Sequence, residues 1–214
     1  MTRASRALAA FGLVVVLGAC SGSSHSATNA AGGAQEKPTT LVTIGSSATE
    51  GDGVADRFRE AWPYLLFDEA FPVSTSLVNA AVDGATVANA PAQQLPLVRE
   101  VKPEVVAIWL GVDDLQEHTP TGQFSSGLRT LIADLHSDGV TRILIADIPN
   151  AFGTSASSYD NAIRAVVRST EVSLVELQNT AISLVPSRGL SNQPDAAGQR
   201  LIATAFERAL RAKS

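Results

Sequence analysis

Apolar, β-branched runs alternate with segments of helical periodicity along the chain from about residue 40 onward. Uninterrupted apolar runs are typical of strands that are buried on both faces of a sheet and joined by crossover helices. Strands are therefore predicted near Thr40–Gly45, Val73–Asn79, Val105–Leu110, Arg142–Asp147 and Ser173–Leu177. Helices are predicted between them, near Asp56–Ala70, Pro91–Val101, Phe124–Asp138 and Ser158–Ser169. These βα units favour a parallel α/β sandwich, in which ligands bind beyond the carboxyl ends of the strands.

The closing segment has the pattern of a helix that packs through one face. It is predicted to begin near Pro194, because a proline ring suits the first turn of a helix. Apolar residues then recur with the helical period, at Leu201, Ile202, Ala205, Phe206, Ala209 and Leu210. Residues 39–214 are long enough and apolar enough to form a single domain with one core.

The first 19 residues have the organisation of a secretory signal peptide. Arg3 and Arg6 precede an apolar stretch, Ala7–Gly18, that is too short for a permanent membrane span. The sequence Leu-Gly-Ala-Cys that ends at Cys20 resembles the lipobox of bacterial lipoproteins. This resemblance implies cleavage before Cys20, lipidation of its sulfur, and a protein anchored on the extracytoplasmic face of the cell membrane. A structural cysteine in an ordinary signal segment is the alternative.

The segment 20–38 is rich in Ser, Gly and Ala, and we expect it to act as a flexible tether between the lipidated cysteine and the domain. The formal charge of the chain is −5, and removal of residues 1–19 takes away two arginines and no acid, which leaves −7. An acidic domain is a poor candidate for binding nucleic acid, because phosphate neutralisation needs clustered Lys and Arg.

The loop that follows the first predicted strand reads GSSATEG and contains Ser47. Backbone amides at the start of a following helix favour negative charge, so a serine at this place is a candidate nucleophile. Serines also cap helices, and that interpretation is equally open. The loop has neither a GxxxxGK[ST] nor a GxGxxG pattern, which disfavours phosphate binding.

Three loop segments together resemble the SGNH, or GDSL-like, hydrolase family. They read IGSSATEG at 44–51, NAAVDGATV at 79–87 and WLGVDDL at 109–115, and each follows a predicted strand. The resemblance covers essentially all of residues 40–212. It implies a flavodoxin-like, three-layer α/β/α sandwich with a five-stranded parallel sheet. It also implies hydrolysis of carboxylic esters, on lipids, acetylated sugars or small acyl esters.

The resemblance assigns roles to residues of these three loops. Ser47 matches the family's nucleophile, while Ser46 replaces the usual Asp beside it. Gly84 matches the glycine whose amide faces the oxyanion. Asp113 stands where the family has an Asn that donates to the oxyanion, and an ionised carboxylate can only accept a hydrogen bond and would repel that charge.

The last family block, DxxHPN, aligns with residues 190–195 and departs from the pattern at both catalytic positions. Leu190 occupies the acid position and Gln193 the histidine position. A serine hydroxyl needs a positioned base to take its proton, and that base is usually a His oriented by a carboxylate. Loss of the histidine in a well-studied serine protease costs roughly 10⁶-fold in turnover.

His118 is the candidate substitute base, because it follows the third strand at the same edge of the sheet as Ser47. Asp83, Asp147 and Glu50 also come from loops near this edge, but an ordinary carboxylate is a weak base for a serine. His136 is expected at a helix end on the opposite edge. Trp109 and Tyr159 are expected to be packing residues.

No cofactor is implied, and no acidic spacing matches an EF-hand loop or a zinc motif. The expected partners are the membrane, through the lipid on Cys20, and an ester, lipid or glycan ligand. Two functions remain: an envelope esterase of low activity acting through Ser47, or a catalytically silent lipoprotein that binds ligands in the same cleft. A structural lipoprotein without a functional cleft is a third alternative.

Overall fold

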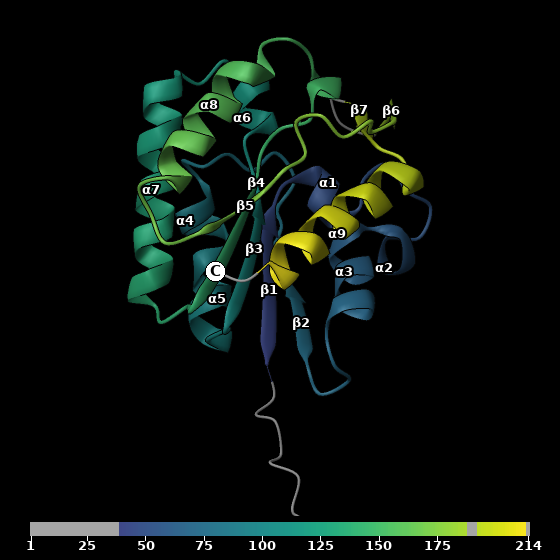
Figure 1. The fold of residues 1–214 in the computed structure, drawn as a ribbon, viewed down its shortest axis with the longest axis vertical. Coiled ribbons are helices and arrows are strands. Elements are labelled where there is room, and N and C mark those ends of the chain that lie inside the picture. Colours follow the sequence, from purple (N-terminus) through teal and green to yellow (C-terminus); the bar gives the residue numbers. More distant parts are fainter. Residues whose placement is uncertain (1–38, 188–191, 213–214) are drawn as a thin grey trace, which may run out of the picture. The chain divides into compact units, whose positions relative to one another are not determined.

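The computed structural model describes residues 39–187 and 192–212. Within these residues, a parallel sheet of five strands has the order β2-β1-β3-β4-β5 (Figure 1). The strands are β1 (Thr40–Gly45), β2 (Ser76–Asn79), β3 (Val105–Trp109), β4 (Arg142–Ala146) and β5 (Ser173–Val175). The prediction of a five-stranded, flavodoxin-like α/β sandwich is confirmed.

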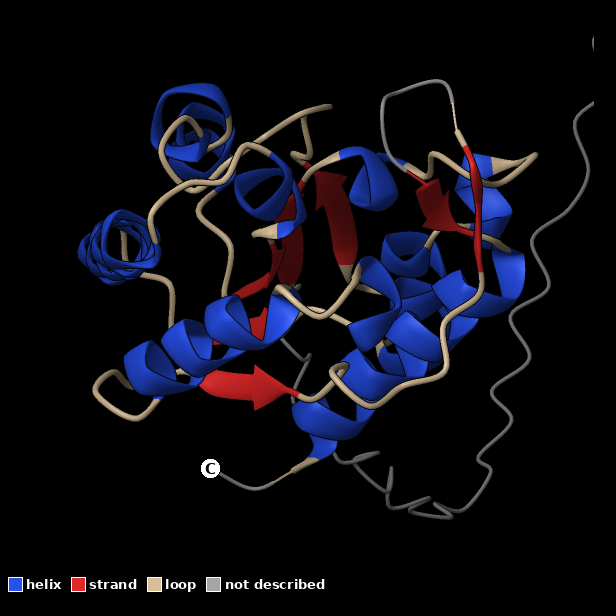
Figure 2. Ribbon diagram, turned by 90° about the horizontal axis from the view of Figure 1, so that it is seen from above, coloured by secondary structure: helices blue, strands red, loops and turns tan. Residues whose placement is uncertain are grey.

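The helices lie in two layers because the strand order reverses after β2. Right-handed crossovers place the helix between β1 and β2 on one face, and those between the later strands on the other. On the first face, α3 (Trp62–Ala70) packs against the closing helix α9 (Ala196–Arg211). On the second lie α5 (Leu95–Val101), α7 (Thr121–Ser137) and α8 (Ala156–Val167), with α7 packed against α8. Figure 2 shows helices on both sides of the strands.

The core forms on both faces of the central strands. The apolar side chains of β1 and β3 are almost wholly buried, as their uninterrupted hydrophobic runs predict. Between α3 and α9, the ring of Trp62 stacks on that of Phe206, with centroids 4.3 Å apart and planes 6° from parallel. Arg142, at the start of β4, donates to the carbonyls of Ala209 and Leu210 and so satisfies the C-terminal end of α9.

In this described part of the chain, no helix has both the length and the hydropathy that crossing a membrane requires.

Two predicted helices are each divided in the structure, which corrects the prediction of continuous helices over Asp56–Ala70 and Pro91–Val101. The first becomes α2 (Arg57–Glu60) and α3, because Ala61 is extended and Pro63 starts a new helix. The second becomes α4 (Ala90–Gln93) and α5. The break between them is at Gln94, two residues before Pro96.

The prediction that the closing helix begins near Pro194 is wrong by two residues. Pro194 ends β7 (Asn192–Pro194), which pairs antiparallel with β6 (Leu184–Pro186). Asp195 is the N-cap of α9, and its side chain accepts a hydrogen bond from the Gly198 amide at 2.8 Å. The carboxylate therefore starts the helix after the proline rather than with it.

The strand predicted from Val73 begins only at Ser76. Residues 72–75 form a turn, in which the Thr75 amide donates to the Pro72 carbonyl at 2.9 Å. Three short helical segments were not predicted: α1 (Ser47–Glu50), α6 (Val112–Gln116) and the 3₁₀ turn η1 (Asn150–Phe152).

Two buried glutamine side chains hold the backbone of the turn after β1. Gln94 accepts from the Gly45 amide at 3.0 Å and donates to the Gly45 carbonyl at 3.1 Å. Gln199 donates to the Ala48 carbonyl at 2.9 Å and accepts from the Trp62 amide at 2.9 Å. Because Gln94 is 1% and Gln199 0% exposed, water cannot replace these bonds.

We expect Gln199→Met to lower the free energy of unfolding by about 1–3 kcal/mol, because it leaves the buried Trp62 amide without an acceptor. Urea unfolding of the purified domain measures this change. The matched control is Gln123→Met on the exposed surface of α7, which should stay within about 0.5 kcal/mol of the parent. Equal stability of the two variants would contradict the structural role of Gln199.

Candidate active site

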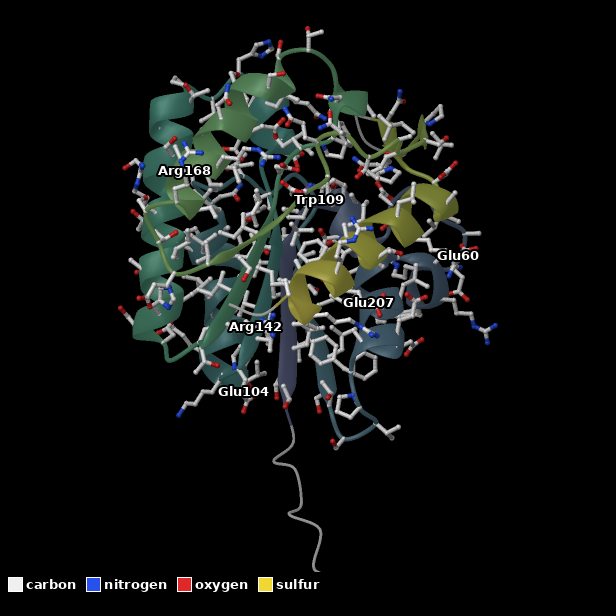
Figure 3. All side chains as sticks on the ribbon, viewed as in Figure 1. Glu60, Glu104, Trp109, Arg142, Arg168 and Glu207 are labelled. Carbon is white, nitrogen blue, oxygen red and sulfur yellow. The ribbon has the colours of Figure 1, made fainter. Side chains whose placement is uncertain are left out.

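A cleft of about 710 Å³ lies where the loops from the carboxyl ends of the strands meet. Trp109, the last residue of β3, marks this end of the sheet in Figure 3, whereas Glu104 and Arg142 lie at the other end. The cleft is lined by Ser47, Asp83, Gly84, Asp113, Gln116, Glu117, Ala151, Phe152, Leu184 and Asn192. The structure therefore brings together Ser47, Gly84 and Asp113, three of the residues chosen from the sequence.

Ser47 is the first residue of α1, directly after an extended N-cap, Ser46. The strand can turn this sharply because Gly45 has no side chain: an added Cβ would lie 2.0 Å from the Thr49 hydroxyl. Thr49 is itself fixed, since its carbonyl accepts from the Asn79 side chain at 2.7 Å. Ser47 therefore lines the cleft, while the carbonyl and the hydroxyl of Thr49 accept hydrogen bonds inside the fold.

The hydroxyl of Ser47 donates a hydrogen bond to Asp83 Oδ1. Asp83 lies in the loop after β2 and is exposed to solvent, whereas Ser47 is 5% exposed. The sequence placed Asp83 among several carboxylates near this edge, and the structure singles it out as the partner of the serine. The nucleophile position therefore contacts a carboxylate instead of an imidazole.

Two backbone amides of the cleft are available as donors. Among the described residues, the amides of Ser47 and Gly84 have no acceptor. Gly84 has a φ of 68°, a left-handed conformation that favours glycine, and a Cβ there would meet open space. Paired amides of this kind can stabilise an oxyanion that forms on a substrate held at Ser47.

Asp113 adds negative charge at the place where the family resemblance implies an amide donor. Burial raises the pKa of its carboxyl above the ordinary value, and the charges of Asp83 and Glu117 raise it further. The hydrogen bond from the Ser46 side chain opposes this rise. Protonated Asp113 could donate to an oxyanion, whereas the ionised form repels one.

Asp114 follows Asp113 directly but is buried and does not line the cleft. It is 0% exposed, and its Oδ2 accepts from the Val87 amide at 3.1 Å. Its Oδ1 has no hydrogen-bond partner within the described residues. Burial raises the pKa of Asp114 to about 6, the Val87 amide lowers it, and the charge of Asp113 raises it again. Asp114 therefore anchors a loop, and only Asp113 lines the cleft.

The closing family block returns to the same neighbourhood, because β7 packs against α1. Gln193, at the histidine position, is 3% exposed and lies beside Gly53, where an added Cβ would be 3.0 Å from the Gln193 Cβ. Gln193 does not line the cleft, but its neighbour Asn192 does. Leu190, at the acid position, lies outside the described residues, as does Cys20.

His118 lines a different cavity from Ser47. It is exposed, has a φ of 56°, and forms part of the wall of a space of about 500 Å³. His136 is exposed in the last turn of α7. In the ranges 39–187 and 192–212, no histidine lines the cleft of Ser47.

The remaining carboxylates near this edge have other contacts. Asp147 is 0% exposed, accepts from the amides of Leu177 and Gln178, and pairs with Arg164, so it ties β4 to the segment after β5. Glu50 is half-buried in α1 and does not line the cleft.

Trp109 and Tyr159 are buried packing residues. Trp109 packs edge-on against Phe152. Tyr159 packs against Phe124, and its hydroxyl donates to the carbonyls of Asp114 and Thr119. No group of three or more metal-ligating side chains is found among the residues whose positions are described.

Comparisons with known proteins agree with this arrangement. The model of the GDSL-like Lipase/Acylhydrolase family matches residues 43–201, which span all three loops and the closing block. The chain belongs to this family. A search of the curated proteins found no match to the sequence.

Solved structures of other proteins, among them proteins described as esterases, share this fold. TesA is similar over 81% of this chain and 98% of its own, with 22% identity and a TM-score of 0.66. Axe2, an acetylxylan esterase from Geobacillus stearothermophilus, covers 82% of this chain and 95% of its own, with 18% identity and a TM-score of 0.64. The psychrotrophic esterase EstA from Pseudoalteromonas sp. covers 81% and 97%, with 20% identity and a TM-score of 0.64.

We expect the domain to be more stable at pH 5 than at pH 7.5. Burial raises the pKa of Asp114 from its ordinary value of 3.8 to about 6 in the folded protein. Between these values the folded state binds more protons, so the free energy of unfolding falls as pH rises. For Asp114 alone the difference between pH 5 and pH 7.5 is about 1 kcal/mol.

Urea unfolding at the two pH values measures this difference. Asp114→Asn should reduce it, and Asp160→Asn should reduce it too, because burial also raises the pKa of Asp160 to about 6. A pH dependence that neither substitution changes would show that these two carboxyls are not its source.

Proposed function

We propose that this protein is a carboxylic ester hydrolase that acts through Ser47 with low turnover at neutral pH. The observation that carries the proposal is the position of Ser47 in one cleft with Gly84, with both backbone amides available as donors. Membership of the GDSL-like family supports it, as do the esterases among the similar structures.

In the proposed reaction the Ser47 hydroxyl attacks the ester carbonyl, and the amides of Ser47 and Gly84 donate to the oxyanion. Asp83 accepts the hydroxyl proton, because it already accepts the hydrogen bond from Ser47. Asp83 then gives this proton to the departing alcohol oxygen, the bond between the carbonyl carbon and that oxygen breaks, and an acyl-serine remains. Water attacks the acyl-serine while Asp83 takes the proton of the water and returns it to the Ser47 oxygen, which releases a carboxylic acid. The substrates belong to the classes of lipid esters, acetylated sugars or small acyl esters.

The low turnover follows from the charges of the cleft. A carboxylate is a much weaker base than the alkoxide it must generate, and ionised Asp113 repels the oxyanion. A serine protease that has lost its triad still accelerates the reaction by about 10³–10⁴-fold over water through binding and the oxyanion site. We expect this protein to accelerate ester hydrolysis by a similar factor, well below the acceleration that an intact triad gives.

A fluorophosphonate probe tests the proposal, because it phosphonylates serines that are activated as nucleophiles. EstA, which has the same fold, is described as inhibited by monoethylphosphonate. The parent protein should be labelled and should hydrolyse p-nitrophenyl acetate, while Ser47→Ala should lose both properties. Ser157→Ala, on the exposed face of α8, should retain both. Equal labelling of the parent and Ser47→Ala would refute an esterase function at this site.

A catalytically silent cleft that only binds its ligand is the second candidate. The observation that favours it is that Ser47 contacts a carboxylate and that no histidine is among the described residues that line its cleft. Gln193, at the position that the resemblance gives to the histidine, cannot take a proton from the serine. Asp113→Asn distinguishes the two functions, because it restores a neutral donor. Hydrolysis should rise by about 10²–10³-fold in a slow esterase. A silent cleft would show no hydrolysis in either protein.

We also propose that the protein is a lipoprotein held on the extracytoplasmic face of the cell membrane through Cys20, with residues 1–19 as its signal peptide and 20–38 as its tether. Cys20→Ala should move the protein from the membrane fraction to the soluble fraction, because the only thiol that could carry the lipid is removed. Cell fractionation with immunoblotting measures this shift. A variant that remains with the membrane would contradict the anchor.

A further inference from the structure

Three carboxylates line the cleft of Ser47 without a basic partner. Asp83 comes from the loop after β2, and Asp113 and Glu117 come from α6 and the residue that follows it. None of the described residues that line the cleft is Lys, Arg or His. Within residues 39–187 and 192–212, no ion pair includes any of the three. The cleft therefore holds negative charge that no described basic side chain neutralises.

The three carboxylates are close enough to repel one another. Asp113 and Glu117 are four residues apart, and the Glu117 amide donates to the Asp113 carbonyl at 2.8 Å, so both side chains leave the same face of one helical turn. Burial raises the pKa of Asp113, and the charges of Asp83 and Glu117 raise it further. Like charges at this spacing lower the stability of the fold. A positively charged ligand would relieve their repulsion.

The arrangement of the carboxylates suits an organic cation better than a metal ion. In the part of the chain that is described, no three Asp, Glu, His or Cys side chains are placed so that they could hold a metal ion. An ammonium group needs no such close coordination, because Coulomb attraction acts over longer distances. The ring of Phe152 also lines the cleft, and the face of an aromatic ring attracts an ammonium group.

The place of the ligand follows from other groups than these charges. Ser47 and the backbone amides of Ser47 and Gly84 mark the position at which an ester carbonyl would react. The cleft, of about 710 Å³, has room beside that carbonyl for the other groups of the ester. The carboxylates then select the charge of those groups, because they repel a phosphate or a carboxylate and attract an ammonium group.

We infer that the ester bound in this cleft carries a positive charge, on an ammonium group that lies among Asp113, Glu117 and the ring of Phe152. This charge offsets that of ionised Asp113, which would otherwise repel the oxyanion at Ser47. The ligand thus supplies the positive charge that the cleft lacks. The inference rests on the proposed function and narrows its substrates from carboxylic esters in general to cationic esters, with the cation in the alcohol part or the acyl part.

Reversal of one charge in the cleft tests the inference. Glu117→Lys changes an exposed residue that the proposed reaction does not use, so the fold should be kept. Glu100→Lys is the matched control, because it makes the same change of net charge at an exposed position of α5 that does not line the cleft. Far-ultraviolet circular dichroism and thermal unfolding check that both variants are folded.

Binding is measured first, in the Ser47→Ala background, so that the result does not depend on turnover. Choline and neohexyl alcohol differ by one atom, a charged nitrogen in place of a neutral carbon, and each is titrated by NMR spectroscopy at low salt. If each carboxylate contributes about 2–5-fold, choline should bind about 10–100-fold more tightly. Glu117→Lys should remove about 10-fold of this preference, because it deletes one attraction and adds one repulsion, and Glu100→Lys should remove none.

Kinetics in the active protein then identify which part of the ester carries the charge. Acetylcholine, with the ammonium group in the alcohol, is compared with neohexyl acetate, and betaine ethyl ester, with that group in the acyl part, is compared with ethyl tert-butylacetate. Each ester is measured in Glu117→Lys and in Glu100→Lys, so its intrinsic reactivity cancels. A kcat/KM that is about 10-fold lower in Glu117→Lys for acetylcholine places the cation in the alcohol, and the same loss for betaine ethyl ester places it in the acyl part.

The inference and the proposed function can fail separately. Equal affinity for choline and neohexyl alcohol, or a preference that Glu117→Lys leaves unchanged, would overturn the inference. Hydrolysis of the neutral esters with no advantage for the cationic ones would overturn it too and would leave the esterase function intact. Preferential binding of choline without hydrolysis of any ester would support the cation site and would refute only the esterase function.

Discussion

The cleft depends on hydrogen bonds from two buried glutamine side chains to the backbone of the turn after β1. Gln94 comes from the helices on one face of the sheet and pairs with both backbone groups of Gly45. Gln199 comes from α9 on the other face and bridges Ala48 to Trp62. Because the bonds are sheltered from water, the turn is fixed to both helix layers at once. Ser47 lies between Gly45 and Ala48, the two residues whose backbone these glutamines bind. The position of Ser47 is therefore set by side chains that are distant in sequence.

The same turn places Ser47, which the family resemblance matches to the nucleophile, among carboxylates whose charge disfavours rapid acyl transfer. An oxyanion site needs donors, and the amides of Ser47 and Gly84 supply them. The side chains around them are carboxylates, of which Asp83 binds the serine hydroxyl and Asp113 stands where an amide donor is expected. The scaffold and the charge distribution thus favour opposite outcomes. The slow esterase that we propose is compatible with both.

The elements that the sequence predicts well are those whose burial is uniform. The strand Thr40–Gly45 is found with the predicted bounds, because an uninterrupted apolar run in this chain is buried on both faces. The helices around Pro63 and Pro96 are divided where the sequence predicts continuous ones, because each proline lacks the amide that a helix interior needs and lies in the first turn of a new helix. The bond between Ser47 and Asp83 joins residues 36 apart in sequence and exists only because two loops leave neighbouring strands at one edge.

Sequence alone determined the α/β class, the family, and the loops that carry Ser47, Gly84 and Asp113, because each of these depends on a local pattern of residues. It also predicts, through the family resemblance, that Gln193 stands where the family has a histidine. Only the tertiary structure decided which carboxylate contacts Ser47, that His118 faces a second cavity, and that Asp114 is buried beside Val87. Those outcomes depend on distances between loops, and such distances are set by the packing of the whole sheet and its two helix layers.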